Sequence, residues 1–189
     1  MSSMNIKIIP TNNITEIEKE AIQVLIYSIW NKQNTTDIHP KEMNATSFYI
    51  TDKNKIIAYL GVLSWNIRIK TETFKMGGLS CVCTHPQYRK QGIGTELVRN
   101  ATKWIIQKGK FDVGLFTCSQ ENTPFYEHIG LWERCHNLII KESDRAGAYI
   151  SNQMGVNVFR LLISEKAKQH TGYFENSIIN LKFPHGEFI

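Results

Sequence analysis

The sequence lacks the features that mark several large classes of protein. Its longest apolar runs are far shorter than the about 20 residues of a membrane span, so we expect no membrane partner. Its opening stretch, MSSMNIKIIPTNN, has no apolar core of useful length, so we expect no secretory signal and a cytoplasmic protein. No repeat or Gly/Ser-rich linker divides its 189 residues, so we expect a single domain over 1–189.

Cysteine is also scarce. The four cysteines, Cys81, Cys83, Cys118 and Cys135, form no C-x-x-C pair, which argues against a zinc site, and we expect no metal. Cys81 and Cys83 flank one residue of an apolar run, so they are expected on one face of a strand as buried, reduced thiols. No histidine is placed to activate Cys118, and no acyl-cysteine intermediate is expected.

The charge balance is moderately basic. With 22 Lys and Arg against 17 Asp and Glu, the formal net charge is +5, which suits an anionic ligand. The basic residues are scattered, and no nucleic-acid-binding module is visible, so we expect no nucleic-acid partner.

Hydrophobic periodicity predicts an α+β fold in the order β-α-βββ-α-β-α-ββ. Thr15 and Glu18 have the spacing of a capping box, and the first helix presents an apolar stripe that includes Ile17, Val24 and Leu25. The three strands in succession favour an antiparallel meander. The expected strands are 5–10, 47–52, 56–69, 73–84, 111–118, 136–142 and 157–163, and the expected helices are 15–30, 93–108 and 123–130.

A glycine-containing turn follows the fourth of these strands. The stretch HPQYRKQGIGTEL, residues 85–97, leads from Thr84 into a helix that begins near Ile93. Free backbone N–H groups and the positive end of the helix dipole meet at such a turn, and Gly92 and Gly94 let a phosphate approach the backbone closely. The turn is therefore a candidate anion site. It has neither the G-K-[ST] of a Walker loop nor the G-x-G-x-x-G of a dinucleotide-binding fingerprint.

The frame around this turn resembles the GNAT superfamily of acyl-CoA-dependent N-acetyltransferases. Residues 89–94, Arg-Lys-Gln-Gly-Ile-Gly, match the family's pyrophosphate loop, Arg/Gln-x-x-Gly-x-Gly/Ala. The stretch ENTPFYEHIGLWE matches a second family segment and supplies Asn122 and Tyr126. The resemblance covers residues 73–133 firmly and the order of the other elements loosely.

The resemblance implies a mixed, mostly antiparallel central sheet with helices on both faces, and acetyl-CoA as co-substrate. It implies that Tyr126 protonates the departing CoA thiolate after direct attack by an amine. Tyr126 could instead be a core aromatic residue, and Asn122 could simply cap its helix. The residues implied to bind the cofactor are Val82, Cys83, Thr84, Arg89, Lys90, Gln91, Gly92, Ile93, Gly94, Thr95 and Asn122.

The base that deprotonates the amine is not assigned. Many relatives carry a glutamate on the strand before the loop, where this chain has Ser80. Serine is a poor base, and the remaining candidates are Glu72, Glu187 and the terminal carboxylate.

The last residues, FPHGEFI, resemble the end of the aminoglycoside 2′-N-acetyltransferases. That resemblance gives Glu187 and the carboxylate of Ile189 substrate-binding roles toward a small-molecule amine; an ordinary solvated tail is the alternative. Two other functions stay open: acetylation of a protein N-terminus or lysine, and a non-catalytic acyl-CoA-binding module. The resemblance to the GNAT superfamily also allows a homodimer.

Overall fold

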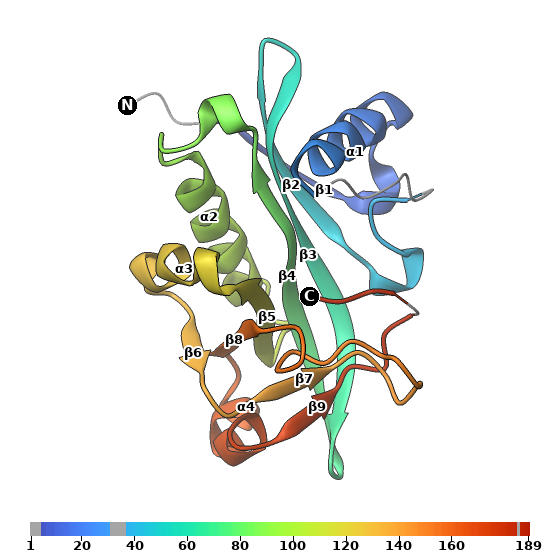
Figure 1. Ribbon diagram of the computed structural model, residues 1–189, viewed down its shortest axis with the longest axis vertical. Coiled ribbons are helices and arrows are strands. Elements are labelled where there is room, and N and C mark those ends of the chain that lie inside the picture. The colour runs from blue at the N-terminus through green and yellow to red at the C-terminus, as the bar shows by residue number, and fades with distance from the viewer. Residues whose placement is uncertain (1–4, 31–36, 185) are drawn as a thin grey trace. The chain divides into compact units, whose positions relative to one another are not determined.

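The structure is a computed structural model that describes residues 5–30, 37–184 and 186–189 (Figure 1). Its strands are β1 (Ile6–Pro10), β2 (Thr46–Asp52), β3 (Lys55–Ile69), β4 (Glu72–Thr84), β5 (Val113–Ser119), β6 (Glu133–Cys135), β7 (Ile139–Lys141), β8 (Val156–Leu162) and β9 (Ile178–Asn180). Its helices are α1 (Glu16–Trp30), α2 (Ile93–Gln107), α3 (Thr123–Ile129) and α4 (Glu165–Gln169), with short 3-10 turns η1 (Thr11–Asn13), η2 (Lys41–Met43), η3 (Pro86–Tyr88), η4 (Gln120–Asn122) and η5 (Thr171–Phe174).

Within the described residues, seven strands form one sheet in the order β1-β2-β3-β4-β5-β8-β6. The pairs β1–β2, β2–β3, β5–β8 and β6–β8 are antiparallel, whereas β4 and β5 run parallel. The parallel pairing is short, since it joins only Met76–Gly78 to Val113–Leu115. The predicted α+β fold with a mostly antiparallel sheet is confirmed. The predicted strand at 136–142 is shorter, as β7, and pairs with β9 in a separate two-stranded sheet.

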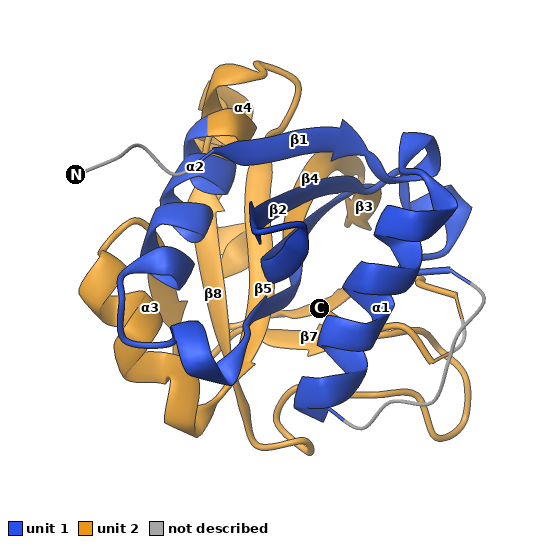
Figure 2. Cartoon of the chain, turned by 90° about the horizontal axis from the view of Figure 1, so that it is seen from above, with its two compact units in different colours: residues 1–64, 79–103 blue, residues 65–78, 104–189 orange. Residues whose placement is uncertain are grey.

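The chain divides into two compact units, shown in different colours in Figure 2. Unit 1 comprises residues 1–64 and 79–103, and unit 2 comprises residues 65–78 and 104–189. The divisions fall inside β3, β4 and α2, so both units contain parts of these elements.

In unit 1, α1 begins with the predicted capping box. The N–H of Glu18 donates to Thr15 Oγ1 at 3.3 Å, and the N–H of Thr15 donates to Glu18 Oε2 at 3.4 Å. The predicted apolar stripe of α1 is wrong in part, because Ile17 is 81% and Val24 69% exposed. The buried face of α1 contains Ile22, which was not in the predicted stripe, together with Leu25, which was. This face packs against residues of β2 and β3.

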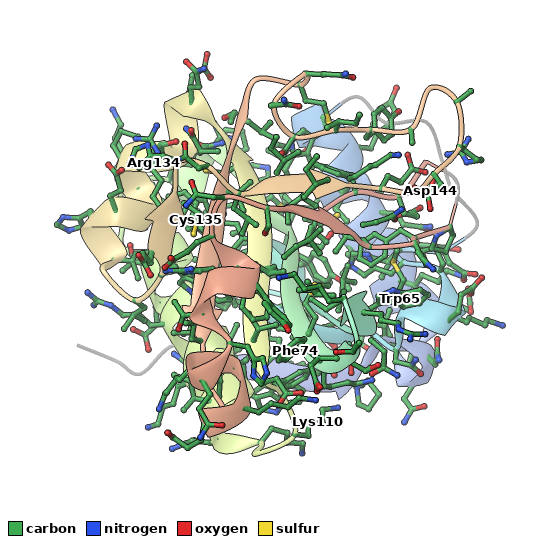
Figure 3. The ribbon with its side chains drawn as sticks, turned by 90° about the horizontal axis from the view of Figure 1, so that it is seen from below. Trp65, Phe74, Lys110, Arg134, Cys135 and Asp144 are labelled. Carbon is green, nitrogen blue, oxygen red and sulfur yellow. The ribbon has the colours of Figure 1, made fainter. Side chains whose placement is uncertain are left out.

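The core of unit 2 is rich in aromatic side chains. Phe116 of β5 stacks on Phe159 of β8 with ring centroids 5.1 Å apart. Elsewhere in the unit, Phe74 lies edge-on to Phe174 at 5.0 Å, and Figure 3 labels Phe74 together with Trp65. Trp65 donates its indole N–H to the backbone oxygen of Leu181 at 2.7 Å, which fastens the segment after β9.

Candidate active site

The predicted site residues are divided between the two units. Residues 82–84 and 89–95 belong to unit 1, and residues 122, 126, 187 and 189 belong to unit 2. The unit 1 residues form a strand end and a turn, which are expected to bind the cofactor. The unit 2 residues include Tyr126, the expected acid, and the C-terminal residues that are expected to bind the acceptor.

The turn between β4 and α2 has the backbone conformation of an anion-binding loop. Lys90 has a φ of 62° and Gly92 a φ of 79°, so left-handed residues interrupt the chain just before α2 begins at Ile93. Such alternation gathers successive N–H groups into a concavity that binds anions. A Cβ built on Gly92 would meet no atom of the described structure within 4 Å, so this side of the loop is open to a ligand.

Side-chain contacts fix the loop to the end of the sheet. Tyr88 donates its hydroxyl to Asp52 Oδ2 at 2.7 Å, and Arg89 Nε donates to the backbone oxygen of Thr84 at 3.2 Å. His85 accepts from the N–H of Gln87 at 3.4 Å and thereby caps η3. Sequence reasoning gave no role to His85, Tyr88 or Asp52, and the bond between Tyr88 and Asp52 joins residues 36 positions apart in the chain.

The loop carries positive charge. Lys55 Nζ lies 3.0 Å from Nε2 of His85, and partial burial, then the charges of Lys55 and Arg89, lower the pKa of His85. The lowered pKa favours the neutral imidazole, which accepts a hydrogen bond through only one of its two ring nitrogens. Arg89 and Lys90 are exposed. This cationic environment favours an anionic group such as a pyrophosphate.

The last part of β4 contains an irregularity. Cys81, three residues before the end of β4, has a φ of 52°, a conformation that redirects the backbone and that L-residues other than Asn, Asp and His seldom adopt. Val82 and Thr84 are half-buried, and burial raises the pKa of the Cys83 thiol well above its usual range. Cys83 can therefore contact a ligand through its backbone rather than as a thiolate. The carbonyl of Thr84 is already engaged by Arg89.

Tyr126 lies in α3 of unit 2 and is 6% exposed. Its ring packs against three phenylalanines, with centroids 4.6 Å from Phe116, 4.9 Å from Phe125 and 5.7 Å from Phe159. The ring therefore contributes to the core, as expected if Tyr126 is a core aromatic residue. This packing also fixes the direction of the hydroxyl, so the structural role and the expected catalytic role are compatible.

A polar network supports the start of α3. Asn157 of β8 donates to Thr123 Oγ1 at 2.6 Å, and its own Oδ1 accepts from Arg134 Nη2 at 3.0 Å. Asn122 is exposed and donates to Ser119 Oγ at 3.1 Å. Asn122 stands at the N-cap position without a capping hydrogen bond from its side chain, so the interpretation of Asn122 as a side-chain cap is wrong.

The C-terminal segment packs against unit 2. Ile189 is 6% exposed, and its backbone oxygen accepts from both the N–H and the hydroxyl of Thr117. Glu187 is half-buried, and its N–H donates to the oxygen of Pro184 at 3.2 Å. The alternative of a solvated tail is therefore wrong for Ile189.

The base candidate Glu72 is engaged elsewhere, and so is Ser80 at the position where many relatives carry a glutamate. Glu72 pairs with Lys166 at 3.0 Å, and the hydrogen bond from Lys166 lowers the pKa of its carboxyl. Ser80 donates its hydroxyl to the sulfur of Cys81 at 3.7 Å. Neither arrangement supplies a ready proton acceptor.

Two kinds of feature are absent from the part of the chain that the structure describes. No cluster of three or more histidine, cysteine and carboxylate side chains is placed to hold a metal ion. No described helix combines the length and the apolar character needed to cross a membrane. None of the four cysteines, which all lie within the described ranges, forms a disulfide.

Solved structures share this fold. An acyl-CoA N-acyltransferase from Pseudomonas aeruginosa aligns over 84% of this chain and 99% of its own, with a TM-score of 0.57 and 13% identity. ElaA from Escherichia coli aligns over 83% and 98%, with a TM-score of 0.56 and 8% identity. An acetyltransferase from Streptococcus agalactiae aligns over 86% and 99%, with a TM-score of 0.55 and 15% identity. At these identities the likeness concerns the fold alone.

Sequence comparison adds the family. The family model of the acetyltransferase (GNAT) family matches residues 13–131, a range that contains the turn at residues 85–97, Asn122 and Tyr126. The match spans more than half of the chain, and the sheet with its short β4–β5 pairing agrees with it. This chain therefore belongs to the GNAT family of acetyltransferases, which transfer acyl groups from acyl-CoA.

Proposed function

We propose that the chain transfers an acetyl group from acetyl-CoA directly to a primary amine of a small-molecule acceptor. The observation that carries this proposal is the turn at Lys90 and Gly92, which combines two left-handed residues, open space and positive charge directly before α2. A compact dianionic group on a cofactor is the ligand that such a turn binds best. We expect the chain to act in the cytoplasm.

In this proposal, each predicted cofactor residue has one task. The backbone N–H groups from Lys90 to Thr95 hold the pyrophosphate, with Arg89 adding charge. The backbone of residues 82–84 holds the pantetheine arm and polarises the thioester carbonyl, because well-aimed N–H donors stabilise a developing oxyanion. Asn122 contacts the cofactor as well.

Tyr126 acts as the acid in the same proposal. The acceptor nitrogen attacks the thioester carbon, the C–S bond breaks, and the Tyr126 hydroxyl donates its proton to the thiolate. The aromatic packing around the ring supports this role, because a general acid must be held within hydrogen-bond reach of the atom that it protonates. No metal takes part in this mechanism.

The tail gives the proposal its acceptor class. We place Glu187 and Ile189 beside the acceptor, where a carboxylate favours a cationic, aminoglycoside-like amine. Glu142 supports this assignment because it holds the segment in place: its backbone oxygen accepts from Phe183 N–H at 2.9 Å, and its Oε1 accepts from Gly186 N–H at 3.0 Å. Glu142 is 1% exposed and also pairs with Arg145 at 2.6 Å.

Thioester turnover with a panel of amines tests the proposal. The panel contains aminoglycosides, linear polyamines, a lysine-containing peptide and a peptide with a free N-terminus, and thiol release is measured together with the mass of the product. We expect acetylation of the small amines. Acetylation of the peptides alone would favour the protein-modifying function, and binding of acetyl-CoA without turnover of any amine would contradict an enzyme.

A further inference from the structure

Unit 1 contains a groove between α1 and the turn that joins β2 to β3. Its volume is about 380 Å³, which falls in the range of roughly 300–1,000 Å³ that small-molecule sites occupy. All the residues that line it belong to unit 1, the blue part of the chain in Figure 2. None of them has a task in the proposed acetyl transfer, so the groove needs an explanation of its own.

One side of the groove is apolar. The helix α1 contributes Ala21, Val24 and Leu25, and β3 contributes Ile56. Leu25 and Ile56 are buried in the core, whereas Val24 is 69% exposed. An apolar side chain that borders a concave surface gains free energy when a ligand removes it from water. This side of the groove therefore fits the apolar body of a ligand.

The opposite side of the groove is cationic. Lys53 and Asn54 have φ values of 46° and 66°, as a two-residue hairpin turn requires, and Lys55 follows them at the start of β3. Lys53 and Lys55 both line the groove and are exposed. Among the described residues, neither ammonium group forms an ion pair with a carboxylate. Their positive charge is thus left for a ligand.

His85 brings a second donor to this side. Its Nδ1 accepts from the N–H of Gln87 at 3.4 Å, so the proton of the neutral ring is on Nε2. Nε2 lies 3.0 Å from Nζ of Lys55, and two donors therefore face each other. In this tautomer no described residue accepts a hydrogen bond from either of them. An anion that accepts from both would replace this opposed contact by two charge-assisted hydrogen bonds.

We propose that the groove binds a small amphipathic carboxylate, such as a medium-chain fatty acid, with its alkyl chain along α1 and its carboxylate against Lys55 and His85. A carboxylate has two oxygens and can accept from both donors at once, while Lys53 adds attraction at longer range. An uncharged ligand would leave the two donors opposed, and a cation would be repelled. The inference does not depend on the proposed acetyl transfer, because none of these residues takes part in it.

A titration of the full chain with sodium octanoate, followed by the backbone amide signals in NMR spectra, tests the proposal. We expect saturable binding, with the largest shifts at Val24, Lys55 and His85. Octan-1-ol has the same apolar body without the charge, and it should bind at least about tenfold more weakly, since it loses the charge-assisted hydrogen bonds. Acetate has the charge without the body and should not saturate in the same concentration range.

Two variants with matched controls locate the site. Lys55→Met keeps an unbranched side chain and removes the donor, so Kd for octanoate should rise at least about tenfold. Lys103→Met changes an exposed lysine of α2 in the same unit and should have no effect. Val24→Gln should raise Kd about fivefold through lost apolar contact. Ile17→Gln is its control, because Ile17 is 81% exposed on the same helix and does not line the groove.

The titration is repeated with saturating CoA, and we expect octanoate still to bind. Displacement of octanoate by CoA would place the carboxylate in the site of the cofactor and overturn the proposal. Equal affinity in wild type and Lys55→Met, equal affinity for octanoate and octan-1-ol, or shifts confined to other parts of the chain would overturn it as well. A protein that acetylates no amine contradicts the proposed function alone, because binding in the groove is measured without turnover.

Discussion

The N–H of Thr117 donates to the backbone oxygen of Ile189 at 3.2 Å, two residues beyond the point where β5 stops pairing with β4. If the parallel pairing of β5 with β4 continued to this point, the N–H of Thr117 would donate to a backbone oxygen of β4. Here the last residue takes that place, and it buries its own side chain while doing so. The tail is thus part of the architecture of unit 2, and deleting it would disturb β5 as well as any acceptor contact.

Substituting Glu187 by Gln tests the acceptor-binding role of the tail without this disturbance. The change removes one charge and leaves the contacts of Ile189 with Thr117 in place. One hydrogen bond to a charged group is worth about 1.5–3 kcal/mol, so we expect the KM of a cationic acceptor to rise at least about tenfold. The KM of acetyl-CoA should stay the same. Steady-state kinetics with both substrates varied measure the two constants, and Glu20→Gln, at an exposed acid of α1, is the matched control.

Substituting Tyr126 by Phe separates its two roles. The ring keeps its contacts with Phe116 and Phe159, so the melting temperature and the affinity for acetyl-CoA should barely change. Turnover should fall by about 10²- to 10⁴-fold, the usual contribution of a general acid. Single-turnover kinetics and calorimetry provide the two readouts. Wild-type turnover in this variant would leave Tyr126 with a packing role only.

The capping box of α1 predicts a specific pH dependence of stability. Hydrogen bonds from Lys7 first, then from Tyr49 and Thr15, lower the pKa of Glu18 to about 2 from its ordinary value of 4.5. Because the folded pKa is depressed, the stabilisation is complete above pH 4.5 and is lost as the pH falls through about 2.

Urea denaturation of wild type and Glu18→Gln checks this dependence. The difference in the free energy of unfolding should be full at pH 6 and shrink progressively below pH 4.5. Glu16→Gln provides the control, because the Glu16 side chain is 80% exposed and lies in the same turn. A difference for Glu18→Gln that does not depend on pH would contradict the prediction.

The local parts of this structure could be predicted from the sequence. The capping box of Thr15 and Glu18, the helix that begins at Ile93 and the left-handed stop of α3 at Gly130 depend on neighbouring residues and on helical spacing. The turn before α2 belongs to the same class, because its glycine and its position before a helix are visible in thirteen consecutive residues, 85–97.

Other parts depended on contacts that no local pattern contains. The α1 sequence is apolar on nearly every side, so periodicity alone could not choose between Ile17 and Ile22 as the buried position. The strands β6 and β9 have three residues each, too few for an alternating signal. His39 and Tyr59 lie 20 residues apart in different elements, and only the fold pairs them.

The central claim is that the loop before α2 holds the pyrophosphate of CoA, and calorimetric titration of Gly92→Val with acetyl-CoA tests it most directly. A Cβ at this position would project into the open space assigned to the phosphate, and a β-branched residue resists a φ of 79°. Left-handed strain alone costs roughly 1–2 kcal/mol, and with the steric block we expect Kd to rise well over about tenfold.

Gly109→Val is the matched control for strain. Gly109 also has a positive φ, of 65°, and also faces open space, but it lies after the end of α2 and outside the loop. Both variants should lose stability, and only Gly92→Val should lose acetyl-CoA binding. Equal affinity for acetyl-CoA in Gly92→Val, Gly109→Val and wild type would contradict the assignment of the loop.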